Sequence, residues 1–219
     1  MVYITGDMHG DFERFRGLGR LKKGDTLIIC GDFGFIWTGS RKEKKILKRI
    51  GRFRFNVAFV DGCHENYDLL EKYSAVKWNG GKARAVSGRL VQLMRGQIYE
   101  IDGRTFFTFG GGHSPDFDIR NETDTWWERE LPTLEEINAA IQRLHDADYH
   151  VDYVITHEPP WSLYSCLNTP PPDHLEVHAF FEEVIQHCEF RRWYFGKSHM
   201  NKTISAKFRA VFDKISRIK

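Results

Sequence analysis

The chain alternates short apolar runs with polar segments, and its first third shows this alternation most clearly. Residues 2–5, 26–30 and 57–60 are apolar runs with the length of buried strands. Each run is followed within two residues by a glycine and then by Asp, His or both. The carboxyl ends of neighbouring parallel strands meet at one edge of an open α/β sheet, so we expect these polar side chains to gather there.

The same patterning predicts the organisation of the whole chain. Residues 1–75 have the pattern of three strand–helix units, which indicates a mostly parallel sheet in that half. The runs 98–101 and 104–109 flank Asp102-Gly103 and predict a tight hairpin. Helices are expected at residues 134–144 and 175–188, and later strands at 152–156, 192–195, 202–204 and 208–212. With no internal repeat or low-complexity linker, a single α/β domain over residues 1–219 is expected.

Five polar segments follow strand-like runs in order along the chain. They are Asp7-x-His9, Gly31-Asp32, Gly62-x-His64-Glu65, Thr156-His157 and Gly196-x-x-His199. In the first segment both side chains lie on the same side of an extended chain, because side chains alternate with period two. Taken singly, each residue has an ordinary explanation, such as an Asp that caps a helix. Carboxylates and imidazoles together are ligands for a divalent metal, so their shared order favours a metal site.

This order of motifs resembles that of the calcineurin-like metallophosphoesterases, as in a prokaryotic or phage-type member, from residue 6 to residue 199. The resemblance implies two packed mixed β-sheets flanked by helices and a two-metal centre. It implies that the first ion is held by Asp7, His9 and His199, and that Asp32 bridges both ions. The second ion would use the residues at positions 63, 157 and 197, of which His157 is a metal ligand of the family type. Catalytic roles would fall on Asp32 and on His64, the proton donor to the leaving group.

Three positions depart from the family pattern. Cys63 stands where the family has Asn, and Lys197 stands where it has His. An ammonium group has no lone pair, so Lys197 would repel a second ion or replace it by holding a phosphate oxygen. A Cys63 thiolate would instead favour zinc or iron. Phe35 replaces an Asp that often orients the His of the third motif, so His64 is expected to lack that partner.

We therefore expect one tightly bound divalent ion, either manganese, zinc or iron, at a centre whose second site is altered and whose activity is reduced. The implied function is hydrolysis of phosphate mono- or diesters by a metal-activated water. The alternative is a non-catalytic scaffold or binding protein that retains the fold. The retained Asp7, His9, Asp32, His157 and His199 favour the enzyme. Phe33-Gly34-Phe35 follows the second motif in place of Asp-Arg-Gly, which disfavours a protein phosphatase.

Composition narrows the class of protein only slightly. The chain has 219 residues, 41% of them hydrophobic, and a net charge of +2, which suits one soluble core. Residues 41–54 are strongly basic and predict a surface helix with a solvated face; nucleic-acid binding is the alternative and is not favoured. No segment is long enough to span a membrane and no leader precedes the first strand. Four scattered cysteines fit reduced thiols in a cytoplasmic protein.

Two segments near the expected site have no regular pattern. Residues 113–131 form a long irregular stretch that contains Trp126 and Trp127. Loops of this length are often covers of ligand sites, but two tryptophans that pin the loop to the body are the favoured interpretation. Residues 168–172 include three prolines and are expected to be an extended stretch at the mouth of the site.

Overall fold

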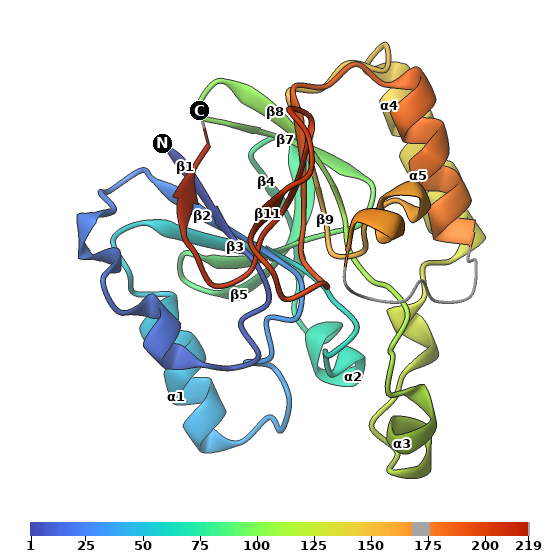
Figure 1. Ribbon diagram of the computed structural model, residues 1–219. Coiled ribbons are helices and arrows are strands. Elements are labelled where there is room, and N and C mark those ends of the chain that lie inside the picture. Colours follow the sequence, from blue (N-terminus) through green and yellow to red (C-terminus); the bar gives the residue numbers. More distant parts are fainter. Residues whose placement is uncertain (168–175, 219) are drawn as a thin grey trace.

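Figure 1 shows the computed structural model of the chain, which describes residues 1–167 and 176–218. Two mixed β-sheets occupy the centre, and helices cover their outer faces (Figure 1). The expected class, an α/β fold of two packed sheets flanked by helices, is confirmed.

The first sheet carries the amino-terminal motifs. Within the described residues its strand order is β13 (Ser216–Arg217), β1 (Val2–Thr5), β2 (Thr26–Cys30), β3 (Asn56–Val60), β6 (Leu90–Leu93), β5 (Gly81–Ser87) and β4 (Ala75–Trp78). β1, β2, β3 and β6 run parallel, whereas β13, β5 and β4 pair antiparallel with their neighbours. The parallel half is as expected, but β4, β5 and β6 add an antiparallel part that the sequence patterning does not predict.

The second sheet carries the carboxyl-terminal motifs. In the described part of the chain its order is β11 (Lys202–Thr203), β12 (Phe208–Ala210), β10 (Arg192–Phe195), β9 (Tyr153–Thr156), β8 (Arg104–Phe109) and β7 (Gln97–Ile101). β8, β9, β10 and β12 run parallel. β7 and β8 form the expected hairpin, with positive φ angles of 55° at Asp102 and 68° at Gly103. Such a turn needs positive φ at both residues, which Asp-Gly tolerates.

Alternation along β2 shows how both faces of a sheet are buried. Ile28 and Cys30 belong to the cluster between the two sheets, which also contains Tyr153 of the second sheet. Leu27 and Ile29 point the other way, into the cluster beneath the amino-terminal helices. Because both faces of β2 are covered, its sequence is apolar throughout rather than alternating.

The helices form the outer layers. They are α1 (Arg41–Ile50), α2 (Tyr67–Leu70), α3 (Phe117–Glu122), α4 (Leu134–Asp146) and α5 (Glu176–His187), with 3-10 helices at Phe12–Phe15, Leu18–Arg20, Glu128–Glu130 and Trp161–Cys166. α1 packs on the first sheet, and α4 and α5 pack on the second (Figure 1). α3 projects from the body (Figure 1). Among the helices of the described residues, none has the length and apolar character needed to span a membrane.

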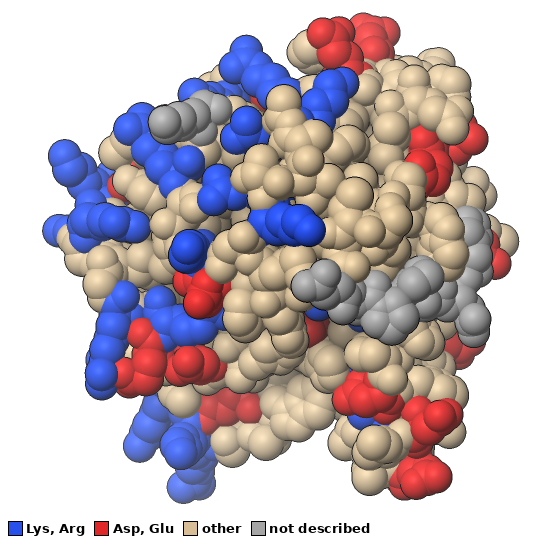
Figure 2. All heavy atoms as spheres, viewed as in Figure 1, with Lys and Arg blue, Asp and Glu red and all other residues tan. Residues whose placement is uncertain are grey.

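The basic segment forms α1 as expected. Leu47 and Ile50 are buried against the first sheet, while the lysines and arginines of α1 are largely exposed. Figure 2 shows basic residues on the side of α1 and acidic residues at the lower right, where Figure 1 places α3. The helix expected from residue 175 is described from Glu176 onward, and residues 168–172, expected at the site mouth, lie outside the described residues.

The motif residues all follow strands at the same edge of the molecule. Asp7, Asp32 and Cys63 come directly after β1, β2 and β3, while His157 and Lys197 come directly after β9 and β10. Within each sheet these strands are parallel neighbours, so their carboxyl ends lie side by side. The packing of the two sheets then brings the two sets of loops together.

Candidate metal centre

Four predicted ligands converge at this edge. Asp7, His9, Asp32 and His199 offer donor atoms that all lie within 4.8 Å of one another. Nε2 of His9 lies 2.9 Å from Nε2 of His199 and 3.8 Å from Oδ2 of Asp32. The two carboxylates are buried and the two imidazoles are exposed. The carboxylate side of the cluster is therefore buried in the protein, and the imidazole side is open to solvent.

The chemistry of this cluster fits a divalent cation. Oδ2 of Asp7 is buried and has no hydrogen-bond partner in the described part of the chain. A buried carboxylate oxygen without a partner is costly, and a cation beside it removes that cost. Burial lowers the pKa of His9, which favours the neutral ring that metal ligation requires. Two carboxylates and two imidazoles form a donor set suited to manganese, iron or zinc.

Four of the nine non-glycine residues with positive φ among the described residues lie at this centre. His9, Asp32, Lys197 and His199 have positive φ angles of 46°, 41°, 63° and 47°. Non-glycine residues in this region cost about 1–3 kcal/mol each, and such residues cluster at functional sites. The chain also approaches itself closely here, because a Cβ at Gly62 would lie 2.0 Å from Oδ1 of Asp32. Packing of the surrounding sheets has to hold this geometry in place.

A buried lysine lies where the family resemblance implies a second metal site. Nζ of Lys197 lies 3.2 Å from Sγ of Cys63 and 3.6 Å from Oε2 of Glu158, and it donates a hydrogen bond to the carbonyl oxygen of His113. Its side chain is only 9% exposed. The predicted ligand His157 lies beside it, with Nε2 3.5 Å from the sulfur of Cys63.

The surroundings of Lys197 keep it charged. Burial disfavours the ammonium form, but the neighbouring Cys63 and Glu158 outweigh burial and raise the pKa of Lys197 above its usual value. Burial also disfavours the charged form of Glu158 and would raise its pKa. Lys197 and the nearby histidines outweigh burial and lower the pKa of Glu158 to about 2. Burial and Asp32 raise the pKa of the Cys63 thiol, but Lys197 and the neighbouring histidines reverse this and lower it. Lys197 is thus a fixed positive charge inside the centre.

His157 links the two halves of the centre. It is fully buried, with Nδ1 3.2 Å from Oδ1 of Asp7 and Nε2 3.6 Å from Oδ1 of Asp32. Burial disfavours its charged form, but Asp32 and Asp7 outweigh burial and raise its pKa well above the usual value. A Cβ on Gly31 would lie 2.1 Å from Nδ1 of His157, so glycine is required where the ring packs against the second motif.

His64 has a carboxylate partner that the sequence does not reveal. Phe35 is buried against Phe33 and offers no acceptor, as expected. Instead, Nε2 of His64 lies 3.2 Å from both carboxylate oxygens of Asp116, while Nδ1 lies 2.9 Å from Oδ2 of Asp32. Burial disfavours the imidazolium, but the contacts with Asp32 and Cys63 raise the pKa of His64 to about 11. His64 thus lacks a partner at position 35, as expected, but Asp116 provides a carboxylate that the sequence does not predict.

Asp116 belongs to a segment that we call the cap, residues 111–131. A buried ion pair between Arg120 and Glu130 holds it together, and Arg120 donates a 2.7 Å hydrogen bond to the carbonyl oxygen of Cys63. Trp127 packs edge-on against Trp37, as the favoured interpretation requires. Trp126 packs inside the cap against Phe117, so it does not pin the cap to the body through that contact. The hydrogen bond that joins the cap to the third motif is not predicted from the sequence.

Three residues around the centre are not predicted from sequence: Asp116, Arg120 and Glu158. Glu158 carries a local signal, because it directly follows His157 at the end of an apolar strand. Asp116 directly precedes the short helix α3 and Arg120 lies within it, and the sequence there has no periodicity that relates a side chain to a strand edge.

The sequence of the chain also matches a known protein family. The sequence model of the calcineurin-like phosphoesterase family matches residues 1–201. The chain belongs to the calcineurin-like phosphoesterase family, in agreement with its motifs. Membership supports divalent-metal binding and phosphoester hydrolysis as a general class of function. No curated protein matches the chain significantly.

Several solved structures are similar to the chain at low sequence identity. GAP50, the anchor in the inner membrane complex of Plasmodium, is 10% identical, with a TM-score of 0.52 over 96% of this chain and 70% of that one. Phosphopantetheinyl hydrolase (PptH) from Mycobacterium tuberculosis is 16% identical, with a TM-score of 0.46 over 96% and 87%. A putative 5'-nucleotidase from Staphylococcus aureus is 14% identical, with a TM-score of 0.48 over 96% and 48%. At these identities the similarity concerns the fold alone.

The arrangement of donors predicts one tightly bound ion per chain after loading with manganese or zinc. Lys197 places a positive charge beside the second position, where it would repel a second cation. Elemental analysis and titration should therefore give a stoichiometry nearer one than two. Asp7→Asn should lower that value, whereas the exposed, distant Asp148→Asn should not. Two tightly held ions per chain would contradict this and would require Cys63 as a thiolate ligand.

Proposed function

We propose that the protein hydrolyses phosphate mono- or diesters, using one divalent ion and Lys197 in place of a second ion. The observation that carries this proposal is the buried Lys197 ammonium beside Cys63. The resemblance to the family implies a second metal site at these two positions. Asp7, His9, Asp32 and His199 would hold the single ion. That ion, when bound, polarises a phosphoryl oxygen and lowers the pKa of water from 15.7 towards about 7. Manganese, zinc and iron suit these ligands.

Lys197 would bind substrate rather than metal. Its ammonium group is held by Glu158 and the carbonyl oxygen of His113, so it is oriented before substrate arrives. A compact ammonium charge can hold a phosphoryl oxygen and stabilise the negative charge that develops there in the transition state. This is the electrostatic part of what a second ion supplies in a two-metal site.

His64 would move the proton to the leaving group, with Asp116 positioning it. A carboxylate that accepts from one ring nitrogen fixes the tautomer and the orientation of the ring. Asp116 lies at hydrogen-bond distance from Nε2, while Nδ1 faces Asp32 and the interior of the centre. The cap therefore takes over the positioning task that an Asp at position 35 would perform.

The alternative function is a non-catalytic scaffold. The same fold occurs in GAP50, whose structure is described as an anchor, so the fold does not decide between the two. The buried, partnerless oxygen of Asp7 and the four left-handed residues favour catalysis, because a scaffold gains nothing from either feature. We further propose a cytoplasmic location, which fits the four free cysteines.

Replacing Asp32 by Asn tests the proposed function directly. Asp32→Asn should abolish turnover of para-nitrophenyl phosphate and its bis ester under added manganese, because the charge that anchors the ion is removed. Asp148→Asn, an exposed carboxylate elsewhere, should leave turnover unchanged. Wild-type activity in a folded Asp32→Asn variant would show that hydrolysis is due to a contaminant or another site. Absence of turnover in the metal-loaded wild type, over a broad panel of phosphate esters, would favour the scaffold.

The role of Asp116 predicts a selective loss of turnover. Asp116→Asn should lower kcat by about 10- to 100-fold, the usual effect of removing a carboxylate behind a functional histidine, with little change in KM. The loss should be larger for alkyl esters than for para-nitrophenyl esters, whose leaving group needs less protonation. Asp116→Glu should restore part of the rate, and Asp118→Asn in the same helix is the matched control. Equal losses in the Asp116→Asn and Asp118→Asn variants would reduce Asp116 to a structural role.

The second metal site should be recoverable by a double substitution. Cys63→Asn with Lys197→His supplies a neutral oxygen and a neutral nitrogen beside His157 and Asp32, and it removes the charge that repels a cation. Metal stoichiometry should rise towards two. Phosphodiester turnover should rise with it if the surrounding groups remain oriented for the reaction. A folded double variant that binds no additional ion would show that positions 63 and 197 do not form a second metal site.

A further inference from the structure

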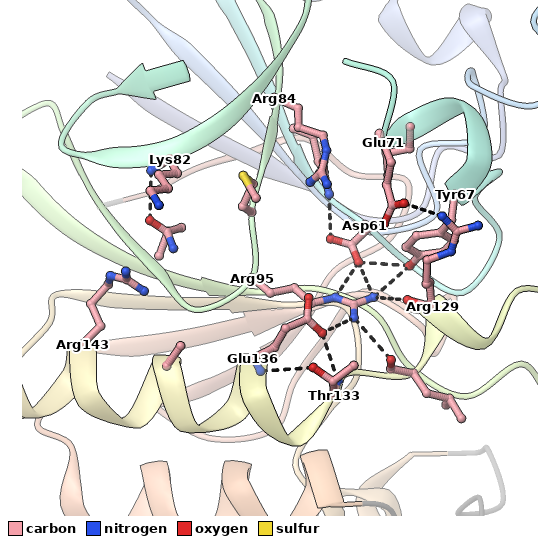
Figure 3. Close-up of a pocket in the computed structure, with 16 residues that line it drawn as sticks. Asp61, Tyr67, Glu71, Lys82, Arg84, Arg95, Arg129, Thr133, Glu136 and Arg143 are labelled. Carbon is pink, nitrogen blue, oxygen red and sulfur yellow. Dashed lines mark hydrogen bonds and ion pairs between the residues drawn. The ribbon is translucent and has the colours of Figure 1, made fainter. Parts of the chain in front are cut away.

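A cavity of about 470 Å³ lies apart from the candidate metal centre (Figure 3). Its walls come from β5, β6 and β7 and from α4, so both sheets contribute. None of the four predicted ligands of the metal lines it. Its size falls within the range of about 300–1,000 Å³ that is typical of small-molecule sites. The cavity is therefore large enough for a ligand and separate from the proposed chemistry.

Five basic side chains line this cavity: Lys82, Arg84, Arg95, Arg129 and Arg143. Two of them are neutralised by carboxylates, Arg95 by Asp61 and Glu136, and Arg129 by Asp68 and Glu71. Figure 3 shows Arg95 between Asp61 and Glu136, and Arg129 beside Glu71. These ion pairs account for the acidic residues of the lining, because Asp61, Glu71 and Glu136 are all engaged in them.

The other three cations have no such counter-charge. In residues 1–167 and 176–218, neither Lys82 nor Arg84 nor Arg143 forms an ion pair within 4.0 Å. The two arginines are oriented by neutral acceptors instead. Arg84 donates to Oε1 of Gln92 at 3.4 Å, and Arg143 donates to the carbonyl oxygen of Gly96 at 2.8 Å. Their guanidinium groups are thus held in place with their charge still available.

A second hollow adjoins the cavity. It has a volume of about 450 Å³ and shares Lys82, Gln97 and Arg143 with the first. These shared residues lie where the two hollows meet, and Lys77 lines the second hollow. Basic residues therefore line both neighbouring hollows, and Lys82 and Arg143 belong to both. We call the two joined hollows the β5–α4 groove.

We propose that the β5–α4 groove binds a small polyanion of the polyphosphate class. Lys82 and Arg143 would hold one phosphate group where the hollows meet, and Arg84 would hold another inside the larger hollow. Guanidinium groups match the geometry of phosphate oxygens, and a concave wall with an excess of positive charge concentrates anions. The proposal does not depend on the proposed hydrolysis, because the groove shares no residue with the groups assigned to it.

Isothermal titration of inorganic pyrophosphate into the full chain, without added divalent metal, tests this proposal. Binding should weaken by about tenfold or more in Lys82→Gln and in Arg143→Gln, because each removes a charge-assisted hydrogen bond. Lys45→Gln, an exposed lysine on α1, is the matched control and should bind as the wild type does. Affinity should also fall as salt is raised. Metal-loaded groove variants should retain wild-type turnover of para-nitrophenyl phosphate if the protein is a hydrolase.

Two further variants separate the groove from the candidate metal centre. Asp32→Asn and Lys197→Met change the centre and should leave pyrophosphate binding intact. Binding that is lost in Lys197→Met but kept in the groove variants would place the anion in the centre and overturn the proposal. Absence of binding to the folded wild type would overturn it as well. Neither result bears on hydrolysis, whose own test is the Asp32→Asn assay.

Discussion

The structure of the centre depends on one buried charge, the ammonium group of Lys197. An unpaired ammonium at this depth would be strongly disfavoured, so its acceptors have to be part of the fold. Glu158 follows β9, Cys63 follows β3, and the carbonyl oxygen of His113 follows β8, so three separate strands supply them. One lysine thereby ties both sheets and the cap together at the edge where the motifs meet. A metal ion at that position would contact the same loops through different donor groups.

The cap becomes part of the centre through the same constraint. Arg120 and Glu130 form a buried pair, and Arg120 also holds the carbonyl oxygen of Cys63. Removing one member of a buried pair typically costs about 3–5 kcal/mol, because the other charge is left without a partner. Weakening these interactions would destabilise the folded protein, so they hold the cap in a fixed position on the third motif. This fixed position is what allows Asp116 to reach His64 and compensates for the phenylalanine at position 35.

Much of this arrangement could be predicted from the sequence, for a physical reason. Asp7, Asp32 and His157 each follow an apolar strand, and the period of the strands together with the geometry of parallel sheets determines where they meet. Asp116 could not be found in this way, because it lies in an irregular segment whose position depends on tertiary contacts. β5 was missed for a related reason. Its exposed lysine and its partly exposed arginine give no clear apolar period, and its pairing with β6 stabilises it instead.

Lys197 and Glu158 form a buried ion pair, so a substitution of Lys197 also affects the carboxylate of Glu158. Replacing Lys197 by a neutral side chain alone would leave the buried carboxylate of Glu158 without its main cation, since Oε2 has no hydrogen-bond partner in the described residues. A second metal ion could supply that missing charge, with Cys63 as a thiolate ligand or with Asn in its place. In the present structure Lys197 is the cation that offsets the negative charge of Glu158, and the same ammonium group contacts the sulfur of Cys63.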